Sequence, residues 1–168
     1  MRRLSRYARL SAGLAVGLAL STPSFAAGKN VVAGTWIMVS AQADPNGGNK
    51  PLFGTHPNGL LIFTADLRFA DVLINPDVPR FASSDRAEGT EAENKAVVAS
   101  DLALYGTYTV DEQGNFATEH VIASIFPNWN GLGRDTSTIT ETVEGDTMTE
   151  RLQDPGGPQI VIVWKRAK

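Results

Sequence analysis

The chain of 168 residues carries 15 basic and 18 acidic side chains, which gives a net charge of −3, and it contains no cysteine. The absence of cysteine excludes disulfides, thiolate metal sites and a cysteine nucleophile. Four basic residues and no acidic ones lie within positions 1–26, so residues 27–168 hold 11 basic against 18 acidic side chains, a net charge of −7. That acidic balance argues against nucleic acid and against an anionic membrane surface as partners.

Residues 1–26 have the pattern of a secretory signal peptide. Four arginines precede an apolar run at 10–20 that is too short to span a bilayer, and small residues occupy Ser24 and Ala26. We therefore predict cleavage after Ala26, or after Ala27 one residue later, and export to the periplasm or beyond the cell without stable membrane insertion. A retained anchor would need a longer apolar run. Residues 27–168 suit one domain.

Strand signals dominate the remaining chain. Short β-rich runs are separated by turn sequences that contain Gly, Asp or Pro. The eight predicted strands span residues 31–41, 59–63, 67–74, 105–111, 115–126, 134–143, 147–152 and 159–165. Tight turns join most of them in chain order, and an up-and-down antiparallel barrel is the closure that leaves no sheet edge exposed.

One insertion between the third and fourth predicted strands has a different character. Residues 75–89 keep neither a strand nor a helix period and are expected to form a long loop. Thr90 and Glu93 match a capping box, which predicts a short helix to about Leu104. Such an insertion in a barrel is expected to cover one mouth or one side.

His120 is the sharpest candidate for a functional side chain. Alternation along residues 116–126 places it with Phe116 and Phe126 on one face, which we expect to point inward because it carries the large aromatics. An interior imidazole can contact a ligand or act as a general base. The structural alternative is a core histidine that is hydrogen-bonded to a neighbour. The other histidine, His56, is expected in a solvated turn, and we predict neither a metal nor a cofactor.

Aromatic and charged residues elsewhere extend the candidate site. The predicted ligand-contacting residues besides His120 are Phe63, Tyr108, Phe116, Phe126, Trp129 and Arg80. The aromatics are alternatively plain core, and Arg80 alternatively pairs with Asp85 to order its loop. Trp36 in the first strand is expected to meet Trp164 or Arg166 in the last and so to plug one barrel end.

Several segments carry a family resemblance. They are residues 34–40 (GTWIMVS), 57–66 (PNGLLIFTAD), 79–86 (PRFASSDR), 105–111 (YGTYTVD) and 120–129 (HVIASIFPNW). Together they resemble the bacterial lipocalin-like domain family, with a departure at Leu67, where that hairpin usually carries Gly. The resemblance implies a calycin-type barrel but no single activity.

The predicted fold is thus all-β: an eight-stranded up-and-down antiparallel lipocalin-like barrel with one short helix between strands 3 and 4. The leading functional interpretation is an exported protein that binds a small, largely hydrophobic molecule inside the barrel. One alternative is an enzyme (a cyclase, isomerase or hydrolase) that uses His120 as general base. Another is a filled barrel that acts through its surface as an inhibitor or assembly module. The sequence indicates no oligomeric state.

Overall fold

The computed structural model describes residues 29–44, 46–153 and 155–168, so the predicted signal peptide lies outside the described residues. The strands are β1 Gly34–Ala43, β2 Lys50–Pro51, β3 Asn58–Phe63, β4 Arg68–Ile74, β5 Leu102–Val110, β6 Phe116–Ser124, β7 Gly133–Asp135, β8 Ile139–Glu144, β9 Thr147–Gln153 and β10 Gln159–Arg166. The helices are η1 Arg86–Glu88, α1 Glu91–Ser100 and η2 Pro127–Trp129. Among the described residues, none of these helices has the length and apolar character needed to cross a membrane.

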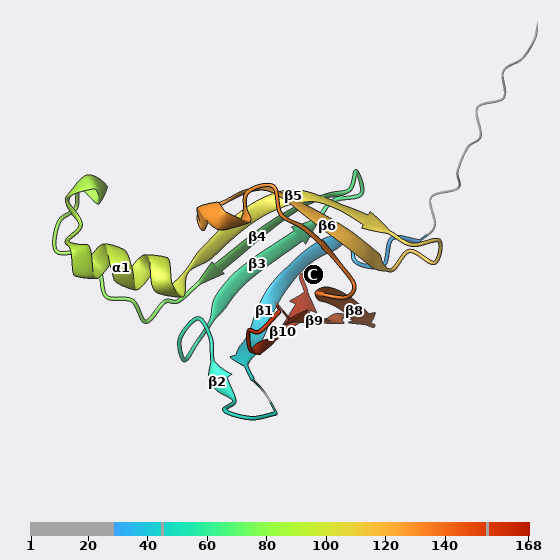
Figure 1. Cartoon of the computed structure of the whole chain (residues 1–168), viewed down its shortest axis with the longest axis horizontal. Helices are drawn as coiled ribbons and strands as arrows, with labels where there is room; N and C mark the ends of the chain where they lie inside the picture. The colour runs from blue at the N-terminus through green and yellow to red at the C-terminus, as the bar shows by residue number, and fades with distance from the viewer. Residues whose placement is uncertain (1–28, 45, 154) are drawn as a thin grey trace, which may run out of the picture.

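The strands form one antiparallel sheet that curves into a nearly closed barrel (Figure 1). Their order is β7-β6-β5-β4-β3-β1-β10-β9-β8, with β2 paired to β1. The first and last long strands are hydrogen-bonded neighbours, with Trp36 opposite Arg166 and Ala43 opposite Ile160. The seam of the barrel therefore falls between β7 and β8, which are consecutive in the chain but are not paired with each other in the sheet.

The structure contains ten strands rather than the eight predicted. One addition is β2, a two-residue strand inside a predicted connection. The other arises because the run predicted at 134–143 is divided into β7 and β8. The Asp135 carboxylate accepts a hydrogen bond from the Ser137 backbone N–H at 2.9 Å, and this turn interrupts the strand. The interruption leaves the seam open.

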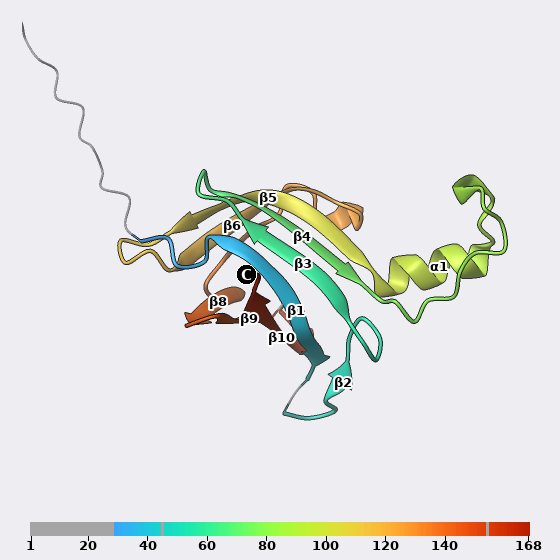
Figure 2. The ribbon, with the colours of Figure 1, turned by 180° about the vertical axis from the view of Figure 1, so that it is seen from behind.

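The insertion projects from the barrel. The predicted capping box is present: the Thr90 hydroxyl accepts from the Glu93 N–H, and the Glu93 carboxylate accepts from the Thr90 N–H. The helix ends at Ser100 rather than near Leu104, because β5 begins at Leu102. None of its residues is buried, and α1 extends away from the ends of β4 and β5 in both views (Figures 1 and 2). We expected the insertion to cover a mouth or a side of the barrel, but the body of the helix does neither.

One end of the barrel is filled with aromatic side chains. The Phe63 ring lies 4.8 Å from that of Tyr108 and 6.3 Å from that of Phe116. The Arg166 guanidinium lies 4.0 Å above the Trp36 ring and donates hydrogen bonds to the backbone oxygens of residues 31 and 33. The Trp36 indole N–H donates to the Val32 carbonyl at 2.8 Å. These contacts close this end, so any interior space lies toward the other end.

Candidate functional site

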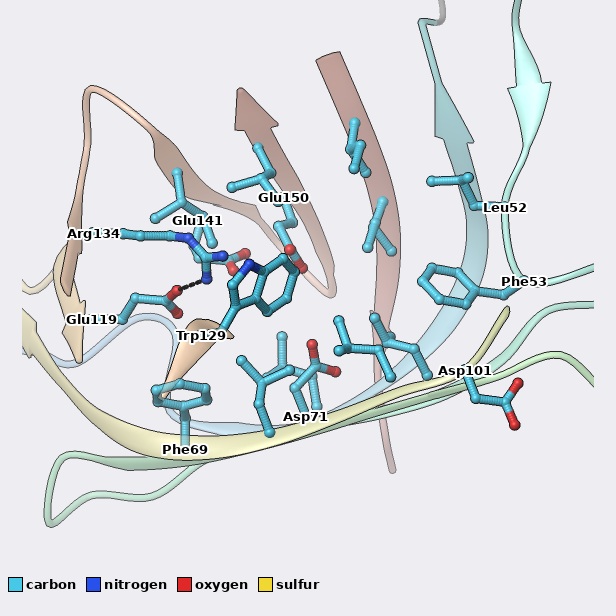
Figure 3. Close-up of a pocket in the computed structure, with 18 of the residues that line it drawn as sticks. Leu52, Phe53, Phe69, Asp71, Asp101, Glu119, Trp129, Arg134, Glu141 and Glu150 are labelled. Carbon is cyan, nitrogen blue, oxygen red and sulfur yellow. Dashed lines mark hydrogen bonds and ion pairs between the residues drawn. The ribbon is translucent and has the colours of Figure 1, made fainter. Parts of the chain in front are cut away.

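The other half of the barrel encloses a cavity of about 250 Å³. Its apolar lining comes from the inward faces of the strands, while the segments nearest its mouth are the end of α1, the loop after β2, and η2. The lining residues are Leu52, Phe53, Leu61, Phe69, Asp71, Leu73, Ala99, Ser100, Asp101, Leu102, Leu104, Glu119, Trp129, Arg134, Ile139, Glu141, Glu150, Leu152, Ile160 and Ile162 (Figure 3). The insertion thus contributes to the site only through its C-terminal end.

Five ionisable side chains lie inside this largely apolar cavity. They are Asp71 on β4, Glu119 on β6, Arg134 on β7, Glu141 on β8 and Glu150 on β9, and each is only 7% exposed. Figure 3 shows Glu141 and Glu150 projecting from one wall and Asp71 from the wall opposite. Burial of charged groups is costly unless they are paired or neutralised, so a cluster of four carboxyls with one guanidinium is unusual for a barrel core.

Strand alternation places these carboxyls inside. In β4 the buried residues recur at every second position, Phe69, Asp71 and Leu73. In β9 the same period gives Met148, Glu150 and Leu152. Because successive side chains of a strand point to opposite faces, an acidic residue between two inward apolar residues must also face inward.

Arg134 is the positive centre of the site. Its Nη1 lies 2.8 Å from Oε1 of Glu119, in an ion pair whose two side chains are 4% and 6% exposed. The guanidinium also lies 4.3 Å from the centre of the Trp129 ring (Figure 3). The same ion pair also lines a groove formed by β6, β7 and the turn that follows β7, so it borders both the cavity and this groove.

Several polar atoms in the cavity lack partners. Within the described part of the chain, Asp71 Oδ1, Glu141 Oε2, and Nε and Nη2 of Arg134 are buried without a hydrogen bond. By contrast, Glu150 Oε2 accepts a hydrogen bond from the Trp164 indole N–H at 3.0 Å. Buried groups without partners are costly to a fold, so their presence beside a cavity is consistent with a site that a ligand completes.

Burial and mutual repulsion raise the pKa values of the carboxyls in the cavity. Burial, followed by the charges of Glu150 and Glu119, raises the pKa of Asp71 well above its ordinary value. Burial, followed by the neighbouring carboxylates, does the same to the pKa of Glu141. The pKa of Glu150 rises to about 7, chiefly through burial. Burial also raises the pKa of Glu119, against the opposing effect of Arg134. The cluster therefore holds protons at pH values where exposed carboxyls have lost them.

The expected interior position of His120 is wrong, because the side chain is exposed on the outer face of β6. The cause is a bulge: Val110 pairs with Phe116 but Thr109 pairs with Thr118, so Ala117 is an extra residue on β6. Phe116 points inward as expected, but beyond the bulge the alternation is inverted. Glu119 takes the interior position instead of His120.

Of the six other predicted ligand contacts, only Trp129 lines the cavity. Phe63, Tyr108 and Phe116 are buried at the filled end, where the Tyr108 hydroxyl donates to the Thr64 carbonyl at 2.7 Å. Phe126 is 43% exposed and contacts Trp129 edge-on from outside the lining. The aromatic residues thus divide between the filled end and the rim of the cavity.

The loop residue Arg80 is exposed and does not line the cavity. Its expected ion pair with Asp85 does not form among the described residues. The Asp85 carboxylate instead caps η1 by accepting from the Ala87 N–H at 2.8 Å. Of the two expected partners of Trp36, the one stacked on its ring is Arg166, while Trp164 lies fully buried beside the carboxyl cluster.

Sequence reasoning missed the five ionisable residues of the cavity. For Asp71 and Glu150 a signal was present, since each stands midway between two apolar residues of its strand. Arg134 carried no such signal, because it lies in a three-residue strand beside the seam. No group of three or more metal-ligating side chains among the described residues is placed to hold a metal ion.

A nearly closed antiparallel barrel with one filled end and one hollow end defines the protein as a calycin-type barrel. A family model described as a lipocalin-like domain matches residues 33–167. The chain therefore belongs to the lipocalin-like domain family. A comparison with curated proteins finds no match to this sequence.

Proposed function

We propose that this protein binds a small, largely apolar molecule in the hollow half of its barrel. The observation that carries this proposal is the enclosed cavity of about 250 Å³, in which leucine and isoleucine side chains surround buried polar atoms that lack partners. Ligand sites typically combine an apolar lining with a few convergent polar groups. The volume lies below the usual range for drug-sized ligands, so the expected ligand has on the order of ten non-hydrogen atoms.

Filling the cavity tests this proposal, and β4 offers a matched pair of positions. Leu73 is 3% exposed and lines the cavity, whereas the adjacent Val72 is 38% exposed on the outer face. Toluene and benzyl alcohol serve as probes, with binding followed by ligand-detected NMR and calorimetry. Leu73→Trp is expected to abolish saturable binding, while Val72→Trp keeps it. Circular dichroism confirms that both variants are folded.

The proposal fails if neither probe binds the unmodified protein, or if Leu73→Trp binds as well as Val72→Trp does. A smaller substitution, Leu73→Phe, is the fallback where the tryptophan variant does not fold. Over-packing of a well-filled core costs about 1–3 kcal/mol, but Leu73 faces open volume.

The structure gives less support to the two alternatives. An interior general base at position 120 is not available, because His120 lies on the outer face. A His120→Ala variant is accordingly expected to leave probe binding unchanged. A surface-acting module was expected to have a filled barrel, whereas this barrel encloses a cavity of about 250 Å³.

We also propose export of the protein, on the basis of the arginine-rich and apolar pattern of residues 1–26. Expression in a bacterial host followed by N-terminal sequencing of the extracytoplasmic fraction is expected to give Ala27, or Gly28 if cleavage falls one residue later. An uncleaved cytoplasmic product would contradict the proposal.

A further inference from the structure

We propose that the cavity recognises a protonated amino group through Asp71 and Glu141, so that the molecule it binds is a small, mainly apolar amine. This inference rests on the binding function proposed above and specifies the chemical class of the ligand.

The first support is the position of the free acceptors. Asp71 Oδ1 and Glu141 Oε2 are buried carboxyl oxygens without a hydrogen-bond partner, and their residues line the same cavity from β4 and β8. Oxygens of the two other carboxyls are engaged, Glu119 Oε1 with Arg134 and Glu150 Oε2 with Trp164. A primary ammonium carries three donors and no acceptor, which complements two free carboxyl oxygens.

The second support is the charge balance of the cavity. The groups that face it are the carboxyls of Asp71, Glu119, Glu141 and Glu150 and the guanidinium of Arg134, with Asp101 near the mouth. Arg134 is paired with Glu119 at 2.8 Å, and its charge also acts to lower the pKa of Glu150, but one guanidinium does not balance four carboxyls. Once these carboxyls are ionised, a bound cation lowers the net negative charge of the cavity, whereas a bound anion raises it.

The third support is that the described side chains do not form a metal-binding site, while the cavity wall is largely hydrocarbon. No three ligating side chains among residues 29–44, 46–153 and 155–168 are placed to share a metal ion. The rest of the lining is dominated by Leu61, Leu73, Leu104, Ile139 and Ile162, which suit a hydrocarbon body. An organic cation fits both features, because its ammonium needs only two acceptors and its body contacts the apolar wall.

The unpartnered Nε and Nη2 of Arg134 present the competing option. These two N–H groups lie on one edge of the guanidinium and are suited to a carboxylate. A carboxylate ligand would approach the one cation of the cavity but would also face all four acidic groups. The experiment therefore compares the two classes directly.

The test uses three ligands of the same shape, benzylamine, benzyl alcohol and benzoate, and measures the affinity of the unmodified protein for each by calorimetry at pH 6.0 and 8.5. Benzylamine is expected to bind roughly tenfold to a hundredfold more tightly than benzyl alcohol at pH 8.5, which is about the contribution of one charge-assisted hydrogen bond and allows for the cost of desolvating the ammonium. Its advantage is expected to shrink at pH 6.0. The pKa values of Asp71 and Glu141 are raised, chiefly by burial, so a larger fraction of these two carboxyls is protonated at the lower pH, and a protonated carboxyl no longer attracts the ammonium by its charge.

Two near-isosteric variants, Asp71→Asn and Glu141→Gln, test the assigned residues, and Glu144→Gln at the exposed end of β8 is the matched control. Each of the first two is expected to remove most of the preference for benzylamine while leaving the affinity for benzyl alcohol within about threefold. Glu144→Gln is expected to keep the preference. Benzyl alcohol binding also reports that each variant is folded.

The outcomes separate this inference from the proposed function. Equal or tighter binding of benzyl alcohol or benzoate overturns the amine assignment and leaves the binding function standing. An amine preference that survives in both Asp71→Asn and Glu141→Gln overturns the roles of these residues. Failure of toluene and all three ligands to bind removes the binding function and the inference with it.

Discussion

The buried carboxyl Glu150 is expected to make the protein less stable as the pH rises from acidic to neutral values. Its pKa is raised from 4.5 to about 7 in the folded protein, chiefly by burial. Below pH 4.5 the carboxyl is protonated in both the folded and the unfolded chain, so it has no effect on their balance. Between pH 4.5 and 7 the unfolded chain releases the proton while the folded protein keeps it, which favours unfolding.

The magnitude follows from the size of the pKa shift. One pKa unit corresponds to 1.36 kcal/mol, so the change from 4.5 to about 7 lowers the free energy of unfolding by about 3 kcal/mol across this window. Asp71 and Glu141 act in the same direction, since their pKa values are also raised. The exposed carboxyls of Asp111 and Asp135 act oppositely, but hydrogen bonds lower their pKa values, so their effect is confined to more acidic solutions. Stability is expected to be greatest near pH 5.

Urea unfolding at pH 5, 6, 7 and 8, followed by tryptophan fluorescence, measures this dependence. Glu150→Gln keeps an acceptor for the Trp164 indole N–H and is expected to flatten the curve between pH 5 and 7. The control Glu144→Gln replaces an exposed carboxyl and is expected to keep the wild-type slope. A free energy of unfolding that is constant or rises from pH 5 to 7, or an unchanged slope in Glu150→Gln, would refute the reasoning.

Three further substitutions are expected to change the free energy of unfolding, each measurable by urea denaturation at pH 7. Arg134→Met leaves the Glu119 carboxylate buried without its partner and is expected to cost about 3–5 kcal/mol; adding Glu119→Gln is expected to recover much of this, and a lack of recovery would contradict the ion-pair assignment. Arg166→Met removes the stacking on Trp36 and two hydrogen bonds to backbone carbonyls, for an expected loss of about 2–4 kcal/mol; a loss below 1 kcal/mol would show that the filled end is stable without it. Leu67→Gly is expected to raise stability by about 0.5–1 kcal/mol, because the φ of Leu67 is +64° and glycine adopts that left-handed conformation without strain, whereas Leu67→Ala is the control that keeps the strain. A loss of stability in Leu67→Gly would indicate that packing of the leucine side chain outweighs the backbone strain.

The amino-acid sequence by itself determined the features that depend on neighbouring residues. Alternation and turn residues located most strands, and Thr90 with Glu93 marked the start of α1. The lipocalin-like resemblance is confirmed by the family match over residues 33–167. These features follow from local rules, because side-chain direction along a strand and hydrogen bonding at a helix end need only a few residues to operate.

Only the tertiary structure decided where the cavity lies and which residues face it. One extra residue at Ala117 inverts the alternation of β6, so Glu119 enters the barrel and His120 leaves it. A bulge is defined by the register against the neighbouring strand, which the pattern of a single strand does not contain. In the same way, Asp71 and Glu141 lie 70 positions apart in the chain and meet at one cavity only because curvature of the sheet brings β4 opposite β8. The chemistry of this site therefore arises from long-range closure of the barrel, while its individual strands are encoded locally.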